Sequence, residues 1–159
     1  MKSFADLLEL HRDLDEVFLE HQRALIRLEL DRAQALLNKY EAQLLAHIRD
    51  EETLMIPLYR ERVSAPVGGA AEIFLGEHEK IRQFVALFKQ EIGKLNLMDD
   101  LERGVLFLLD SQHLFKRLLV HHDTRERKIL YPLLDQVTSE EERLVLFAKL
   151  DSSFFRLRH

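Results

Sequence analysis

The stretch His47-Ile-Arg-Asp-Glu51, followed by Pro57, has a close copy 75 positions later in His122-Asp-Thr-Arg-Glu126, followed by Pro132. In each copy the histidine and the glutamate stand four residues apart, so on a helix their side chains lie on one face, one turn apart. Apolar residues fill the interval before each proline. Each copy is therefore a pair of chelating arms on a helix, and two copies that face each other could hold two metal ions.

The sequence around the two copies predicts four long helices. Apolar residues recur at helical spacing over about 4–28, 31–60, 70–95 and from the Asp99–Glu102 start signal to about 134. Similar start signals, a capping residue with an acidic or amide residue three positions later, are Ser3 with Asp6 and Asp31 with Gln34. Ser139 with Glu142 opens a shorter helix over about 140–150. The clearest linker is 63–69, which contains a proline and a glycine pair.

These elements predict an all-α fold. Two or three residues separate the first two helices, so they must pack antiparallel. The expected architecture is an up-down-up-down antiparallel four-helix bundle with a short C-terminal fifth helix, formed as a single domain by residues 1–159. The prolines should kink or end the second and fourth helices, because proline lacks an amide donor and clashes with the preceding turn.

Composition excludes several classes of site. The chain has 159 residues and no cysteine, so disulfides, thiolate metal sites and cysteine nucleophiles are excluded, and any metal must be bound by nitrogen and oxygen. The net charge of -5, with both signs interspersed, leaves no basic stripe for nucleic acid. Neither a membrane span nor a secretory signal is visible. We therefore expect a cytoplasmic protein that binds neither nucleic acid nor membrane.

Depth along the bundle selects the partner of His47. His47 lies about 16 residues into its helix, roughly 24 Å from the first interhelical turn at 1.5 Å per residue. His11 lies about 17 residues before the same turn, whereas His21 lies only about 7 residues, or roughly 10 Å, from it. We predict His11 as the partner, with His21 as the alternative.

In the second half, His78 takes the place that His11 has in the first, because apolar residues follow both histidines at the same offsets. Counting residues places His122 about 5 residues deeper than His78, which indicates a longer or less regular connection between the third and fourth helices. His121 is an alternative to His122, although only His122 repeats the four-residue spacing of the first copy. The predicted metal ligands are four imidazoles and two carboxylates: His11, His47, Glu51, His78, His122 and Glu126.

This order of ligands on four antiparallel helices resembles the hemerythrin-like, or HHE cation-binding, domains. The resemblance extends from about Leu7 to Leu134. It implies a non-haem centre of two iron ions, bridged by the carboxylates of Glu51 and Glu126 and by an oxo or hydroxo group. Imidazole and carboxylate ligands also suit other ions, so zinc and manganese are the substitutes to consider.

The chain differs from the oxygen-carrying hemerythrins at two positions. Those proteins have a further histidine one turn after the third-helix ligand, where this chain has Arg82. They also have an aspartate five residues after the last histidine, where this chain has Arg127. The set of four histidines and two glutamates is more similar to iron-centre repair proteins and to the iron-sensing hemerythrin domain of an F-box protein. These 159 residues contain neither the cysteine region of the former nor an F-box.

We therefore predict a di-iron protein that binds oxygen, nitric oxide or iron in a sensing or stress-response role. No separate acid, base or nucleophile accompanies the predicted ligands, which favours a binding protein over an enzyme. Two alternatives are a di-iron enzyme acting on peroxide, oxygen or nitric oxide, and a metal-free helical interaction module that uses the Phe154-Phe155 tail.

Several polar and aromatic residues are expected to lie outside the metal centre. His113 and His159 have no partner in the ligand pattern. The charged runs 49–52 and 125–128 are interpreted as solvated faces with one glutamate in each turned inward. The three tyrosines, Tyr40, Tyr59 and Tyr131, are expected to pack in the core, with a hydrogen bond near the site as the alternative.

Overall fold

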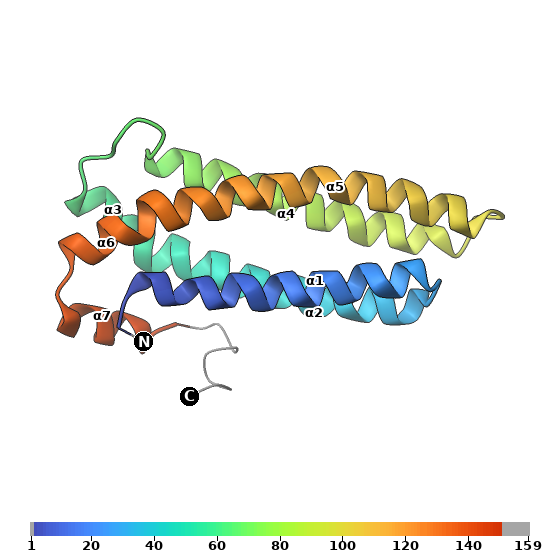
Figure 1. The fold of residues 1–159 in the computed structure, drawn as a ribbon, viewed down its shortest axis with the longest axis horizontal. Helices are drawn as coiled ribbons and strands as arrows, with labels where there is room; N and C mark the ends of the chain where they lie inside the picture. The colour runs from blue at the N-terminus through green and yellow to red at the C-terminus, as the bar shows by residue number, and fades with distance from the viewer. Residues whose placement is uncertain (1, 151–159) are drawn as a thin grey trace.

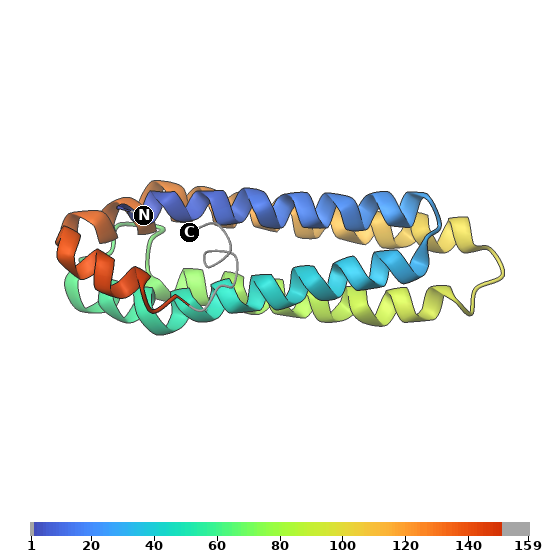
Figure 2. The same cartoon turned by 90° about the horizontal axis from the view of Figure 1, so that it is seen from below.

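Residues 2–150 are described by the computed structural model, and they fold into an antiparallel bundle of helices (Figure 1). The predicted all-α bundle is thus confirmed. Its long helices are α1 (Leu8–Ile26), α2 (Leu30–Asp50), α4 (Ala71–Leu95) and α5 (Leu101–Arg125). A 3₁₀ turn, η1 (Phe4–Leu7), precedes α1. The predicted short helix is α7 (Glu140–Phe147), which lies across one end of the bundle and stops before the expected position 150 (Figure 2). The Phe154-Phe155 tail lies outside the described residues.

Two helix starts are as predicted and two differ. The capping boxes at Ser3 and Ser139 are both present. However, α5 is capped by Asp100 rather than Asp99, because the Asp100 carboxylate is the one that accepts the Arg103 amide, at 3.1 Å. The start of α2 has no side-chain cap. The preceding turn is closed instead by backbone hydrogen bonds, so the predicted cap at Asp31 is not needed.

A single π-helical turn precedes each of the two site prolines. The turns are η2 (Glu51–Met55) and η3 (Glu126–Leu130), and the chain then continues into α3 (Ile56–Arg62) and α6 (Tyr131–Val137). In both turns the amide that precedes the proline, of Ile56 or Tyr131, donates to the carbonyl five residues back, of Glu51 or Glu126. Since proline has no amide hydrogen, the predicted disturbance takes the form of a widened turn, and each predicted ligand glutamate is its first residue.

Buried apolar side chains form two clusters at different depths along the bundle. The first joins α1, α2, α4 and α5, and contains the packed aromatic rings of Phe18, Tyr40, Phe88 and Phe115. The second lies at the end closed by α3, α6 and α7, and includes Phe4, Tyr59, Phe74 and Tyr131. A layer of buried polar residues lies between the two clusters. No helix within residues 2–150 is long and apolar enough to cross a membrane.

Candidate metal centre

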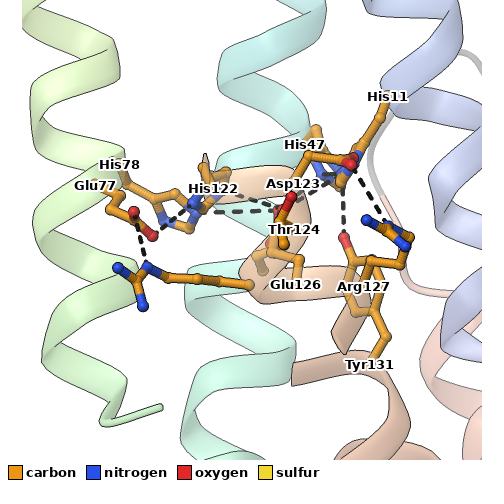
Figure 3. Close-up of polar contacts among 12 residues, drawn as sticks. His11, His47, Glu77, His78, His122, Asp123, Thr124, Glu126, Arg127 and Tyr131 are labelled. Atoms are coloured by element: carbon orange, nitrogen blue, oxygen red, sulfur yellow. Dashed lines mark hydrogen bonds and ion pairs between the residues drawn. The ribbon is translucent and has the colours of Figure 1, made fainter. Parts of the chain in front are cut away.

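The six predicted ligands meet in the polar layer between the two apolar clusters. Their elements supply them from four sides: α1 carries His11, α2 carries His47, α4 carries His78 and α5 carries His122, while the two glutamates begin the π turns. Figure 3 shows the imidazoles and Glu126 turned toward one another. Counted from the observed helix ends, a difference of 4 residues remains, since His78 lies 17 residues before Leu95 and His122 lies 21 residues after Leu101. The rings of His78 and His122 lie 4.8 Å apart at their centroids.

Two overlapping groups of side chains have a spacing suited to a metal ion. One consists of His11, His47, Glu51 and Glu126, and the other of His78, His122 and the same two glutamates. Within each group the candidate ligand atoms all lie within 4.8 Å of one another. Both carboxylates therefore belong to both groups, as bridging between two ions requires.

The distances show how the two carboxylates link the halves of the bundle. Glu51 Oε1 lies 2.7 Å from His47 Nε2 and 4.0 Å from His78 Nε2. Glu126 Oε1 lies 3.1 Å from His122 Nε2 and 3.4 Å from His11 Nε2. Each glutamate is thus placed between one histidine of each half, and all four imidazoles turn the Nε2 atom to the centre.

The burial of these atoms fits a site for cations. The side chains of Glu51 and Glu126 have no exposed surface, and apart from their short contacts with the imidazoles their four carboxylate oxygens have no hydrogen-bond partner among the described residues. His78 Nε2 is also buried without a partner. Burying an ionised carboxylate with no compensation is costly. Two metal ions would supply that compensation, and the nitrogen and oxygen donors suit iron, manganese or zinc.

The charge state of the site also agrees with ligation. Burial alone would raise the pKa of Glu51, but the neighbouring His47, His78 and His122 outweigh it and lower the pKa to about 2. Burial lowers the pKa of His78 and so favours its neutral imidazole. Ionised carboxylates and neutral imidazoles are the forms that bind metal ions.

Carboxylates accept hydrogen bonds from the outer ring nitrogen, Nδ1, of three of the four histidines. His11 Nδ1 donates to Asp123 at 2.6 Å, His78 Nδ1 to Glu52 at 3.0 Å, and His122 Nδ1 to Glu77 at 3.2 Å. The hydrogen bond from His11 is the main reason that the pKa of Asp123 is lowered. With its proton on Nδ1, each ring keeps the Nε2 lone pair free for a metal ion.

These three acidic residues were not predicted as part of the site. The interpretation of 49–52 as a solvated face with one inward glutamate is wrong for Glu52, whose side chain is only 23% exposed because it reaches across to His78. Asp123 likewise reaches from α5 to His11, and Glu77 reaches from α4 to His122. The available signal was their position, since each directly follows or precedes a predicted ligand. Arg82, which stands where oxygen carriers have a histidine, forms an ion pair with Glu52.

Of the three tyrosines, Tyr131 lies at the centre itself. Its hydroxyl is 3.2 Å from His11 Nε2, and the side chain is fully buried. Tyr59 donates instead to the Gly69 carbonyl at 2.6 Å, and Tyr40 packs in the first apolar cluster. Of the two predicted roles, packing or a hydrogen bond near the site, Tyr131 therefore has both, since its ring also packs in the second apolar cluster.

The structure also separates the alternative histidines from the centre. His21 is buried in the first apolar half, where Nδ1 donates to the Ala33 carbonyl at 2.7 Å and Nε2 lies 2.9 Å from the Gln112 amide. His121 and His113 lie on the exposed face of α5. His159 lies beyond the part of the chain that the structure describes.

A cavity of about 230 Å³ reaches the centre from one side of the bundle. Its inner wall includes His11, His47, His122 and Glu126. Most of the remaining wall is apolar, with Asp15, Asp123, Thr124 and Arg127 as its polar part. The apolar residues are Leu14, Leu44, Ile48, Ile81, Leu119 and Val120. A small molecule can therefore approach the His11 and His47 side of the centre through a largely apolar space.

Comparison with known proteins agrees with this geometry. The model of one protein family, the hemerythrin HHE cation-binding domain, matches residues 3–134. That span includes all six side chains of the centre and both π turns. No match was found among curated proteins or among solved structures. Since the match covers most of the chain, the protein belongs to the hemerythrin HHE cation-binding family.

Proposed function

We propose that this protein binds two iron ions and uses them to bind a small diatomic ligand, oxygen or nitric oxide, in a sensing or stress-response role. One observation carries the proposal: two four-residue groups share the same two carboxylates, Glu51 and Glu126. One ion would be held by His11 and His47 and the other by His78 and His122. The glutamates would bridge them.

The donor set supports iron as the metal. Imidazole favours borderline ions, whereas carboxylates favour harder ones, and iron accepts both. Two iron ions held in this way would supply open coordination positions and a change of oxidation state. The protein contributes the fixed imidazoles, the buried carboxylates and a site that lies between two apolar clusters.

The cavity supports a small ligand. It leads to His11 and His47 past mostly apolar side chains, which suits an uncharged diatomic molecule. The Tyr131 hydroxyl lies beside His11 Nε2, so it is placed to donate a hydrogen bond to a molecule bound on that side.

Metal analysis with optical spectroscopy tests this function. We expect about two iron ions per chain in the wild type and a visible absorption band that changes when oxygen or nitric oxide is added. Glu51→Gln with Glu126→Gln should lose both ions, since the two bridging charges are removed without a change of volume. Less than one metal ion per chain in the wild type would contradict the di-iron proposal.

Two histidine variants test the assignment of the ligands. His11→Ala removes a proposed ligand and should reduce the bound iron to about one ion per chain or less. His21→Ala is the matched control, because this histidine is buried in the apolar half and should leave the iron content unchanged. The reverse result would show that His21, not His11, is the ligand.

A further inference from the structure

The histidines of the two proposed metal positions differ in the support that they receive. At the second position both outer nitrogens have a carboxylate partner, His78 with Glu52 and His122 with Glu77. Each of these carboxylates is in turn bound by an arginine. Arg82 pairs with Glu52, and Arg125 Nε lies 3.2 Å from Glu77 Oε2. Each of these two histidines is thus oriented by a carboxylate that is itself paired with an arginine.

The first position has less support. His11 donates to Asp123, but that aspartate is 40% exposed and its arginine, Arg127, lies 4.0 Å away and is half exposed. No acidic oxygen of the described residues lies within 4.0 Å of the outer nitrogen of His47, which has its contact with Glu51 through Nε2. Both histidines of this position line the cavity, whereas at the second position His122 lines it and His78 does not.

The internal sequence repeat shows why the two positions differ in their supporting carboxylates. Glu77 directly precedes His78, and the matching residue before His11 is Leu10. Glu52 directly follows Glu51, and the matching residue after Glu126 is Arg127. The ligands repeat, but the carboxylates that support them do not.

We propose that the two metal positions bind with unequal affinity, and that the His78–His122 position fills first because Glu52 and Glu77 position its imidazoles. A carboxylate on the outer nitrogen fixes the tautomer and orientation of the ring and increases its basicity, and its loss reduces metal affinity by roughly 10- to 100-fold. Glu52 and Glu77 are positioning residues, since they act through the histidines. The inference rests on the proposed two-ion centre and adds the order in which it is occupied.

A titration of the metal-free protein with Zn²⁺, followed by NMR of the histidine side chains, tests the order directly. Zinc is diamagnetic and suits the same donors. We expect the ring signals of His78 and His122 to shift with the first equivalent, and those of His11 and His47 with the second. The inference would be overturned if both equivalents of zinc bound at once, or if the first equivalent bound at His11 and His47. Either result would leave the two-ion centre intact. Fewer than two equivalents would overturn both.

Variants test whether the carboxylates cause the difference. Glu52→Gln and Glu77→Gln, singly and together, should weaken the first binding step by roughly 10- to 100-fold. The matched control is Glu72→Gln. Glu72 lies on the same helix as Glu77, and its exposed carboxylate pairs with Arg60 away from the centre. Urea unfolding of the metal-free variants measures any loss of folding stability. If the two carboxylates act by positioning the histidines, the metal affinity should fall by more than this loss of stability explains. Unchanged zinc affinity in the double variant would overturn the assignment.

Discussion

At the scale of single residues, His21 shows how a buried imidazole can be structural rather than metal-binding. Its two nitrogens meet the Ala33 carbonyl and the Gln112 amide, and it touches the ring of Phe18. Burial is the main cause that lowers its pKa from the ordinary value of 6.5. The folded protein therefore favours the neutral ring.

This lowered pKa predicts a pH dependence of folding stability. Because the unfolded chain binds a proton at His21 more readily than the folded one, the contribution of His21 is fully present above about pH 6.5 and is lost as the pH falls toward the lower folded value. We expect the free-energy difference between wild type and His21→Gln, from urea unfolding, to shrink over that interval. A difference that is constant from pH 7.5 to about 5 would contradict this explanation.

A second residue-scale prediction concerns the Tyr131 hydroxyl. Tyr131→Phe removes the hydroxyl that lies 3.2 Å from His11 Nε2 and leaves the ring in place, so the metal content should not change. If the hydroxyl donates to a molecule bound at the His11–His47 position, azide affinity should fall by roughly 2- to 10-fold, the effect of one hydrogen bond. Tyr59→Phe is the control, because its hydroxyl bonds the Gly69 carbonyl instead. Equal azide affinity in wild type and Tyr131→Phe would exclude this role.

At the scale of elements, the two π turns connect the sequence repeat to the geometry of the centre. Each begins at a proposed bridging glutamate and ends just before the residue that precedes the proline. Isolated π turns inside α-helices often occur at functional sites. Here the proline explains the turn locally, because proline has no amide hydrogen and interrupts the regular hydrogen-bond ladder six residues after the glutamate.

The turn between α1 and α2 offers an element-scale prediction about stability. Leu28 has a left-handed backbone with φ of 58°, and the Glu29 amide reaches back to the Ala24 carbonyl at 2.9 Å. This is the helix-ending motif in which glycine is usual. Since the left-handed conformation costs a side-chain-bearing residue about 1–2 kcal/mol, Leu28→Gly should raise the free energy of unfolding by about 0.5–1 kcal/mol after the added backbone entropy of glycine.

Leu97→Gly is the matched control for that substitution. Leu97 is an exposed leucine in the other interhelical turn, between α4 and α5, and its φ is not positive. Glycine there adds backbone freedom to the unfolded chain without relieving strain, so stability should fall. If both variants changed stability equally in urea unfolding, the strain at Leu28 would not be the cause.

At the scale of the whole molecule, the proposed centre joins all four long helices between two separate apolar clusters. Metal binding should therefore stabilise the entire bundle, since the unfolded chain does not hold the six ligands together. One ion at a free concentration 1,000 times its dissociation constant contributes about 4 kcal/mol. For a chain of this size, that corresponds to a rise in Tm of roughly 8–16 °C.

Thermal unfolding with and without added iron(II) under anaerobic conditions measures this effect. The rise should be absent in Glu51→Gln with Glu126→Gln and retained in Glu41→Gln, whose carboxylate pairs with Lys89 away from the centre. An equal rise in all three proteins would indicate binding elsewhere on the molecule.

The fold and the chelating pairs could be predicted from the sequence because both depend on short-range spacing. Apolar periodicity places the helices, and a four-residue interval places His47 with Glu51 and His122 with Glu126 on one face whatever the neighbouring helices do. The choice of His11 over His21 followed from helix length alone, and the structure places His11 at the centre. The cap of α5 was predicted one residue early, because neighbouring aspartates differ only in which carboxylate reaches the amide.

Contacts between helices were decided only by the tertiary structure. Glu52 and His78 are separated by 26 residues, Glu77 and His122 by 45, and Asp123 and His11 by 112. Whether such side chains meet depends on the rotation and depth at which two helices pack, which no local spacing determines. By itself the sequence determined an all-α bundle with two chelating pairs. The packing decided that the two groups of candidate ligands share Glu51 and Glu126, that Tyr131 lies beside them, and that the outer nitrogens of His78 and His122 both meet carboxylates.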